Sequence, residues 1–363
     1  MDGQFQTDLP LEGEFRTWNY SRLLENHDNI KYAKLYCGGK DIEEICPTLL
    51  GVKWKMVSRK INAFYASLRE SKVSVKNVCV SDIIPEKWLK EFSSVKNEIT
   101  QYVFETYKEP NNHEFLVDLT RLVVDIEKRK LNLIDNSFKS DRISYDIFGT
   151  RTGRMTTSEN SFPILTLPKT ERSKICPTND LFFALDFNAA EIRALNVLLG
   201  KKSPQVDLHE WNAKNILKRD VDRDTIKKDF FAWLYNPNSK NKELEKYYDR
   251  EKVLKEYFKS NRVINPFGRE IESDRFHALS YLVQSTLTDI FLRQAIKVYK
   301  YLKEQNANSF ISSLIHDNLV LDVDKREKEL IKKCIDIFSN TDYDVFKCSV
   351  SVGKNFGEMK GLL

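Results

Sequence analysis

Two short segments of the sequence each place an aspartate at the end of an apolar strand pattern. Asp186 follows the apolar run 181–185, and Asp317 lies between the apolar runs 310–315 and 319–323. If these strands lie side by side, the two carboxylates meet. Mg²⁺ prefers oxygen ligands and takes one or two protein carboxylates beside substrate phosphates. The pair, with the backbone carbonyl of Phe187 as a further oxygen, predicts a two-metal site that transfers phosphoryl or nucleotidyl groups.

A second group of candidate residues is spaced four apart, as Arg223, Lys227, Phe231 and Tyr235. Each step of four turns by only about 40° around an α-helix, so the four side chains share one face roughly 18 Å long. The two cations suit phosphates, and the two aromatic rings suit a base or a sugar. The face has the polarity of a nucleotide, although an amphipathic helix that buries its aromatics shows the same spacing.

The elements that must position these residues mix strands and helices in the second half of the chain, which favours an α+β fold. Upstream, three-and-four hydrophobic spacing predicts two long antiparallel helices over 83–133. Downstream, the pattern predicts several helices over 207–260 and a hairpin that carries Asp317. The remaining expected elements are a strand over 181–185, helices over 189–199, 275–302 and 326–339, and a strand over 346–352.

The composition is that of an ordinary globular protein, with 363 residues, 41% hydrophobic and 31% charged. A net charge of +5 permits a polyanionic partner without demanding one. The six cysteines include no Cys-x-x-Cys pair, which indicates reduced cytosolic thiols and speaks against a zinc site. No apolar run reaches membrane-span length. The polar start, 1–19, predicts neither a secretory nor a mitochondrial leader.

Taken in order, the motifs resemble those of family A DNA polymerases, the group of bacterial DNA polymerase I and related phage enzymes. The family's first palm motif is an Asp, a Glu five residues on, and then an apolar residue and Arg. Its fingers motif is Arg, Lys, Phe and Tyr at steps of four, and its last palm motif is His-Asp-Glu. The matching residues here are Asp186, Glu191, Ile192 and Arg193, then Arg223, Lys227, Phe231 and Tyr235, then His316 and Asp317.

Three smaller segments match the family in the same order. Thr152-Gly153-Arg154 resembles the segment that contacts the duplex minor groove. The segment 207–209 resembles the Asp-Ile-His ahead of the fingers, and 284–290 resembles a Gln-Gly-Thr-Ala-Ala-Asp-Ile helix. Together the six ordered matches extend over roughly residues 85–363 and are stronger evidence than any one of them.

The resemblance implies a right-hand fold, in which an antiparallel sheet with helices forms a palm between helical fingers and a helical thumb. The implied parts are an N-terminal segment of unknown role (1–82), thumb-like helices (83–145), the first part of the palm (146–206), the fingers (207–275) and the second part of the palm (276–363).

The resemblance also implies roles for individual residues. Asp186, Asp317 and the carbonyl of Phe187 would hold two Mg²⁺ ions, with Mn²⁺ as the alternative, and Lys227 would be a general acid toward pyrophosphate. The other implied contacts are phosphate binding by Arg223, Lys227 and His209, nucleotide packing by Phe231 and Tyr235, exclusion of a 2′-hydroxyl by Glu191, minor-groove contact by Arg154 and Gln284, and primer-terminus contact by His316.

Several residues depart from the family pattern. Asn318 stands where the family has Glu, which removes an acidic residue near the metals. Asn236 replaces a glycine after the fingers motif, and Pro237 then ends that helix. Ser285 replaces a glycine in the segment 284–290. The Arg and Asn expected before that segment are Phe276 and Ser280.

The function implied is template-directed DNA synthesis from a primer, without proofreading, since 1–82 shows no Asp-x-Glu on an apolar strand. The implied partners are primer–template DNA and deoxynucleoside triphosphates, with a separate exonuclease, helicase or processivity protein left open. A monomer in the cytoplasm is expected, the host's if a phage encodes it, in replication or repair. Two alternatives stay open, a single-subunit RNA polymerase-like enzyme and a non-catalytic DNA-binding replication subunit.

Overall fold

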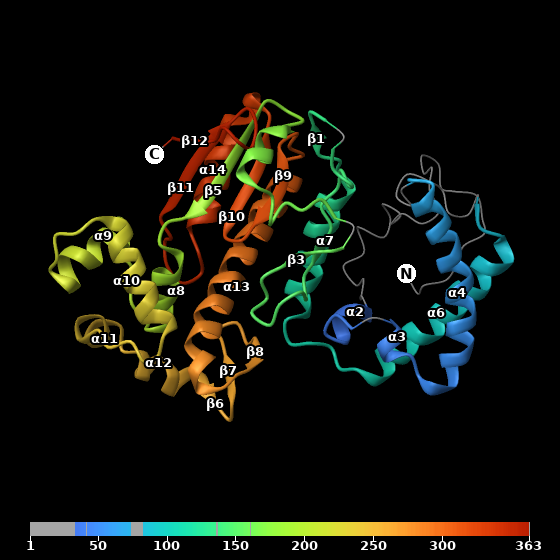
Figure 1. Ribbon diagram of the computed structural model, residues 1–363, viewed down its shortest axis with the longest axis horizontal. Coiled ribbons are helices and arrows are strands. Elements are labelled where there is room, and N and C mark those ends of the chain that lie inside the picture. The colour runs from blue at the N-terminus through green and yellow to red at the C-terminus, as the bar shows by residue number, and fades with distance from the viewer. Residues whose placement is uncertain (1–32, 41, 74–82, 136, 160, 363) are drawn as a thin grey trace. The chain divides into compact units, whose positions relative to one another are not determined.

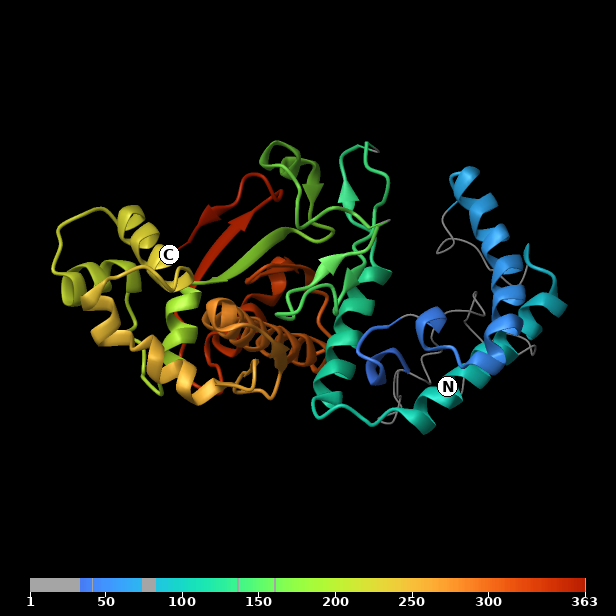
Figure 2. The ribbon, with the colours of Figure 1, turned by 60° about the horizontal axis from the view of Figure 1, so that its bottom comes forward.

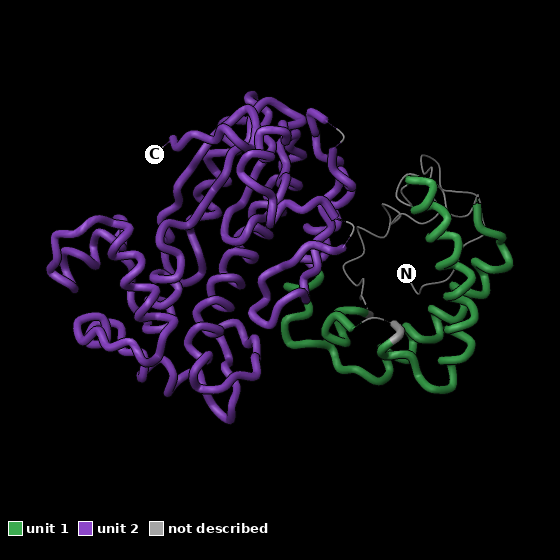
Figure 3. Tube along the Cα trace, in the orientation of Figure 1, with its two compact units in different colours: residues 1–117 green, residues 118–363 purple. Residues whose placement is uncertain are grey.

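The computed structural model describes residues 33–40, 42–73, 83–135, 137–159 and 161–362 (Figure 1). The polar start 1–19, expected to be no leader, lies outside these residues. The chain divides into two compact units, Met1–Val117 and Asp118–Leu363 (Figure 3). Every candidate site residue lies in the second unit.

The described part of the first unit is helical, and its two long helices pack on each other. Trp54 and Val57 of α4 share an apolar cluster with Val95 and Ile99 of α6. The partner of α6 is therefore α4, whereas the sequence predicted an antiparallel partner downstream of it. The helices are α2 (Ala33–Tyr36), α3 (Ile42–Ile45), α4 (Thr48–Glu70), α6 (Glu86–Thr106) and the first turn of α7 (His113–Lys128).

The second unit is built on a five-stranded antiparallel sheet with the strand order β12-β11-β5-β10-β9. The central strand β5 is flanked by β10 and β11, so the segment 181–187 lies between strands from the last third of the chain. This confirms an α+β fold. The strands are β5 (Leu181–Phe187), β9 (Phe310–Ile315), β10 (Asn318–Val323), β11 (Cys348–Gly353) and β12 (Lys360–Gly361).

Helices α13 (Arg275–Glu304) and α14 (Lys328–Ser339) cover one face of this sheet (Figure 2). The ring of Phe187 stacks on Phe338 of α14 at 4.3 Å between centroids, and Phe291 of α13 contacts Phe338 at 6.0 Å. Successive residues of a strand point to opposite faces. Asp186, next to Phe187, therefore projects on the face that these helices leave open.

Helices also follow β5, as the sequence predicts for 189–199 and 207–260. These are α8 (Ala190–Leu198), α9 (Leu208–Asn212), a π-helical turn η3 (Ala213–Leu217), α10 (Arg223–Tyr235), α11 (Lys242–Tyr248) and α12 (Arg250–Tyr257). Shorter elements complete the unit, namely β1 (Asn132–Leu133), β2 (Tyr145–Asp146), β3 (Thr156–Thr157), η2 (Lys169–Lys174), β4 (Ile175–Cys176) and η4 (Lys325–Glu327).

Two local predictions differ from the structure. The helix expected to continue to residue 133 ends at Lys128, and β1 follows it. A three-stranded sheet of β6 (Phe258–Lys259), β7 (Arg262–Ile264) and β8 (Glu270–Glu272) begins where the sequence predicted helix up to residue 260. Ser260 and Asn261 make its first turn with φ of 51° and 56°, without the glycine that marks such turns.

Candidate active site

The register of β5 and β10 sets the relation between the two predicted aspartates. Asp186 is the direct partner of Asn318, which pairs in turn with Ile315 of β9. His316 and Asp317 form the turn between β9 and β10, and His316 has a φ of 56°. Asp317 is therefore one residue from the position that faces Asp186. The structure brings together the two carboxylates that the sequence predicts to meet.

Charged side chains from five separate segments of the chain act on one another at this point. Burial, followed by the charge of Asp317, raises the pKa of Asp186 to about 7, while Lys227 acts in the opposite direction. Burial also raises the pKa of Glu191; Asp317 adds to this, and Arg154 and Lys227 oppose it. The charges of three carboxylates thus act on one another here, and a cation bound between Asp186 and Asp317 would relieve this repulsion.

Helix α10 presents its nucleotide-like face away from its own buried side. Its buried residues are Ile226, Phe230, Trp233 and Leu234. Phe231 and Tyr235 are only half-buried, and their rings stack at 5.8 Å with 15° between planes. The ammonium of Lys227 lies 5.8 Å from the ring of Phe231. The predicted face of Arg223, Lys227, Phe231 and Tyr235, called the stripe from here on, is therefore distinct from the core-facing side of the helix.

The start of α10 is tied to the end of β5 through Asp207. Its carboxylate accepts hydrogen bonds from Nε of Arg223 at 2.8 Å and Nδ2 of Asn188 at 3.1 Å. It also caps α9 by accepting from the backbone N–H groups of His209 and Glu210. Although burial works to raise it, these hydrogen bonds hold the pKa of Asp207 at about 2. Asp207 is therefore ionised near pH 7, and its carboxylate is paired with the guanidinium of Arg223.

His209 lies behind this ion pair, in contact with the stripe. Its side chain is 2% exposed, its ring is 6.0 Å from that of Phe231, and its Nδ1 has no hydrogen-bond partner. Burial lowers the pKa of His209 to about 4, with Asp207 opposing this and Arg223 adding to it. The imidazole is therefore neutral near pH 7.

Tyr235 joins the stripe to the residues predicted to contact the minor groove. Burial, followed by the charge of Glu191, raises the pKa of Tyr235 to about 12; the charge of Arg154 and a side-chain hydrogen bond with Gln284 oppose this. His316 is exposed in the turn beside Asp317. The structure thus groups the predicted residues of this site. The ring of Phe187 faces α14, while its backbone, which carries the predicted carbonyl ligand, directly follows Asp186.

The residues present fit a divalent cation with few protein ligands. Among the described residues, no three His, Cys, Asp or Glu side chains form a metal-binding cluster, so Asp186 and Asp317 stand as a pair. The Oδ1 atom of Asn318, opposite Asp186, is buried without a hydrogen-bond partner. Two carboxylates and an orphaned amide oxygen are the hard oxygen donors that Mg²⁺ prefers.

Two residues that support the site were given no role by the sequence. Asp207 was noted only as part of a family match, although its hydrogen bond to Arg223 links two elements. Tyr145 of β2 reaches β9, where its hydroxyl donates to the carbonyl of Leu314 at 2.8 Å and accepts from the N–H of Leu314 at 2.9 Å. No spacing in the sequence signals this contact, because 169 residues separate the partners.

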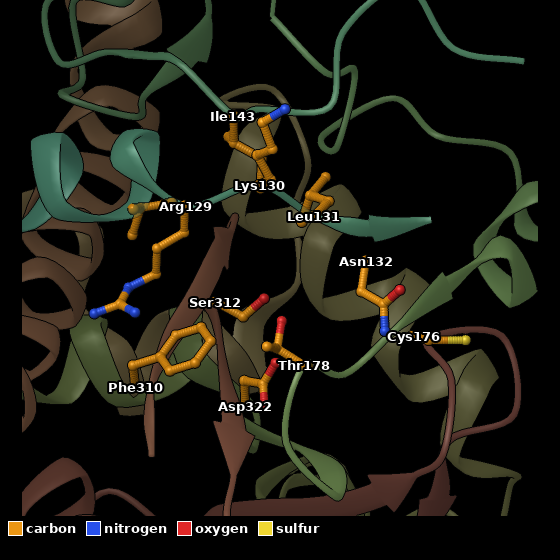
Figure 4. Close-up of a pocket in the computed structure, with 11 residues that line it drawn as sticks. Arg129, Lys130, Leu131, Asn132, Ile143, Cys176, Thr178, Phe310, Ser312 and Asp322 are labelled. Carbon is orange, nitrogen blue, oxygen red and sulfur yellow. Dashed lines mark hydrogen bonds between the residues drawn. The ribbon is translucent and has the colours of Figure 1, made fainter. Parts of the chain in front are cut away.

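A pocket at the other end of β10 is separate from this site (Figure 4). Its lining includes Arg129, Thr178, Ser312 and Asp322. Asp322 is 2% exposed and accepts hydrogen bonds from the backbone N–H groups of Thr178 and Asn179, at 2.6 Å and 2.9 Å. Its carboxylate thus satisfies a loop, and none of the predicted site residues lines the pocket.

Comparisons with known proteins agree with this arrangement. The chain is 28% identical over 88 residues to DNA polymerase I of Caldicellulosiruptor bescii, across 24% of this chain and 10% of that protein. It is 25% identical over 209 residues to the DNA polymerase of Mycobacterium phage D29, across 47% of this chain and 33% of that protein. The chain thus spans a third or less of these relatives. No protein-family model matches it.

A solved structure shows the fold class. The POL domain of Pol1 from M. smegmatis, in complex with DNA primer-template and dNTP, matches with a TM-score of 0.50 and 16% identity, covering 84% of this chain and 66% of that one. The chain therefore has the fold of a polymerase domain. Its resemblance to family A DNA polymerases is confirmed by relatives that are a bacterial DNA polymerase I and a phage DNA polymerase. None of the described helices combines the length and apolar character that a membrane crossing requires.

Proposed function

We propose that this chain is a template-directed DNA polymerase that adds deoxynucleotides to a primer 3′ end. One observation carries the proposal. The carboxylates of Asp186 and Asp317 meet at the open face of an antiparallel sheet, and the charge of Lys227, from the nucleotide-like face of α10, acts on Asp186. A carboxylate pair facing phosphate-binding cations is the arrangement that nucleotidyl transfer requires.

Asp186 and Asp317, with the backbone carbonyl of Phe187, would hold two Mg²⁺ ions, or Mn²⁺, whose chemistry when bound is to activate the primer hydroxyl and stabilise the departing pyrophosphate. Lys227 donates a proton to that pyrophosphate, since it lies on the phosphate end of the stripe. Arg223 leaves Asp207 to bind phosphate oxygens. His209, neutral at pH 7, donates one hydrogen bond to them.

The remaining residues set the shape of the nucleotide site. Phe231 and Tyr235 pack on the incoming base and sugar. Glu191 lies beneath the sugar and excludes a 2′-hydroxyl. Arg154 and Gln284 contact the minor groove of the new base pair, and His316 contacts the primer terminus. Movement of α10 toward the sheet would couple correct pairing to catalysis.

The proposal also assigns segments of the chain to the palm, fingers and thumb of a right-hand polymerase fold. The sheet-bearing segments 146–206 and 276–363 form the palm, 207–275 the fingers and 83–145 the thumb. Segment 1–82 has no proposed role beyond offering a surface for a separate exonuclease, helicase or processivity protein. The enzyme acts as a monomer in the cytoplasm on primer–template DNA.

A primer-extension assay tests the proposal. Purified protein receives a labelled primer–template, Mg²⁺ and four deoxynucleoside triphosphates. Asp186→Asn and Asp317→Asn should each slow extension by about a thousandfold, because each removes a ligand charge. Affinity for the duplex should change little, since it rests on phosphate contacts. Glu329→Gln, which neutralises an exposed carboxylate on α14, is the control and should extend like the wild type.

The same assay separates the alternatives. Primer shortening without nucleotides would contradict the proposed absence of proofreading. An RNA polymerase-like enzyme would extend with ribonucleotides, whereas the proposal expects this only after Glu191→Ala. Duplex binding by the wild type without any extension would assign the chain to non-catalytic DNA binding instead.

A further inference from the structure

The backbone of Gly153 lies directly against the guanidinium group of Arg269. A Cβ atom at Gly153 would stand 2.6 Å from Cζ of Arg269 and 2.7 Å and 2.9 Å from its terminal nitrogens. Gly153 also has a φ of +81°, a conformation that other residues rarely adopt. The position therefore requires glycine twice over, once for its backbone and once for its contact with Arg269.

Arg269 cannot simply move aside, because Asp289 holds it from behind. The carboxylate of Asp289 accepts from Nε at 3.0 Å and from a terminal nitrogen at 2.6 Å, and its side chain is 3% exposed. Asn265 donates to the same carboxylate at 2.7 Å and accepts from the backbone N–H of Arg269 at 3.0 Å. A bidentate pair with a buried carboxylate, here with a half-buried guanidinium, fixes the plane of that guanidinium.

Gly153 directly precedes Arg154, whose charge acts on Glu191 and Tyr235. The carbonyl of Arg154 accepts a hydrogen bond from Oγ1 of Thr150 at 2.8 Å, which closes the turn from its other end. The backbone that carries Arg154 is thus held on one side by the Thr150 hydroxyl and on the other by the Arg269 guanidinium.

Asp289 and Gln284 lie on the same helix, α13. Gln284 shares a side-chain hydrogen bond with Tyr235, and Asp289 reaches the Arg154 turn through Arg269. Helix α13 therefore contacts Tyr235 through Gln284. It also reaches the turn that carries Arg154, through Asp289 and Arg269.

We propose that Arg269, clamped by Asp289, is a positioning residue that seats Gly153 and thereby aims Arg154 at the bound duplex. The inference rests on the proposed polymerase function. Arg269 itself touches neither the DNA nor the nucleotide. Its planar guanidinium provides a flat, charged surface against which the backbone of Gly153 packs. A lysine keeps the charge opposite Asp289 but lacks this plane.

The test is a double-mutant cycle between Arg269→Lys and Arg154→Ala, read by fluorescence anisotropy of a labelled primer–template and by the KM and kcat of extension. Alone, Arg269→Lys should weaken duplex affinity and raise the KM for primer–template by about tenfold. In the Arg154→Ala background the same change should have almost no further effect. An ion pair that only stabilised the fold would weaken binding equally in both backgrounds, which would overturn the inference.

Two variants complete the design. Arg262→Lys in the neighbouring strand β7, an exposed arginine paired with Glu270, should leave affinity and KM unchanged. Gly153→Ala forces a Cβ into the guanidinium while leaving the Arg269–Asp289 pair in place, so it tests this packing surface if Arg269→Lys folds poorly. It too should lose its effect when Arg154 is absent, and an undiminished effect there would contradict the inference. Because anisotropy needs no catalysis, failure of wild-type extension would remove the proposed function and still leave this cycle readable.

Discussion

Asp186 and Asn318 are direct partners across β5 and β10, and the amide oxygen of Asn318 has no hydrogen-bond partner. Side chains directly opposite each other on antiparallel strands have Cβ atoms about 5 Å apart. The resemblance to family A polymerases predicts a glutamate at this position, which would place a third carboxylate beside Asp186 and Asp317. Asn318 keeps a side-chain oxygen at this position but carries no charge. Without a bound ion, Asp186 and Asp317 therefore meet less electrostatic repulsion than they would beside a glutamate.

Asn318→Asp should therefore lower the stability of the ion-free protein and raise its affinity for divalent cations. At a pH above the pKa of Asp186, which is about 7, two like charges directly opposite would lower the free energy of unfolding by about 1 kcal/mol without divalent ions. The added charge should tighten Mn²⁺ binding several-fold. Urea unfolding in chelator and calorimetric titration with Mn²⁺ measure the two effects. Asn238→Asp, in an exposed turn after α10, is the matched control, and equal effects from both variants would count against a role for Asn318.

His209 should contribute a loss of stability in mildly acidic solution, while Asp186, with a folded pKa of about 7, contributes in the opposite direction over the same pH range. Its pKa is about 4 in the folded chain, against an ordinary value of 6.5. Between these values the histidine binds more protons in the unfolded chain than in the folded one, so its contribution to the free energy of unfolding falls as the pH drops from about 6.5 toward 4. His209→Gln removes this contribution, so the wild type should lose stability relative to the variant as the pH drops through this range.

Urea unfolding across this pH range measures the effect. A difference between wild type and His209→Gln that stays constant across this range would contradict the prediction.

The parts of the site that the sequence predicts are those encoded by local patterns. An apolar strand that ends in Asp186, a hairpin that carries Asp317 and a four-residue spacing from Arg223 to Tyr235 each lie within one element. Their assembly follows from the pairing of two strands, which their apolar character already favours.

The parts that the sequence does not predict depend on side chains from separate elements. Arg223 pairs with Asp207, and Arg269 with Asp289, across 16 and 20 residues, and no periodicity links them. The strands over 258–272 are too short for a clear alternation, and the turn at Asn261 lacks a glycine signal. The spacing of residues within one element carries no information about contacts between side chains of different elements.

Asp207 should compete with the nucleotide for Arg223. Asp207→Asn keeps a side-chain oxygen that can cap α9 but removes the charge that holds the guanidinium at 2.8 Å. The freed arginine should bind triphosphate more readily, so the KM for deoxynucleotides should fall several-fold at unchanged duplex affinity.

Steady-state kinetics on one primer–template measures this change. Asp224→Asn is the control, because Asp224 also lies near Arg223, at 3.9 Å, but its side chain is 82% exposed. A raised KM in Asp207→Asn would show that the pair positions Arg223 for the nucleotide instead of withholding it.

Tyr145 should support the turn that carries Asp317. Its hydroxyl both donates to and accepts from the backbone of Leu314, three residues before that aspartate, and all three groups are buried. Tyr145→Phe leaves a buried N–H and a buried carbonyl without partners, so the free energy of unfolding should fall by about 2 kcal/mol. The amide of Leu314 should also exchange faster with solvent, since the end of β9 loses its restraint. Tyr343→Phe, whose hydroxyl lies 3.4 Å from the carbonyl of Pro266, should cost less. Equal costs for the two variants, or an unchanged Leu314 amide, would place the anchor of the turn elsewhere.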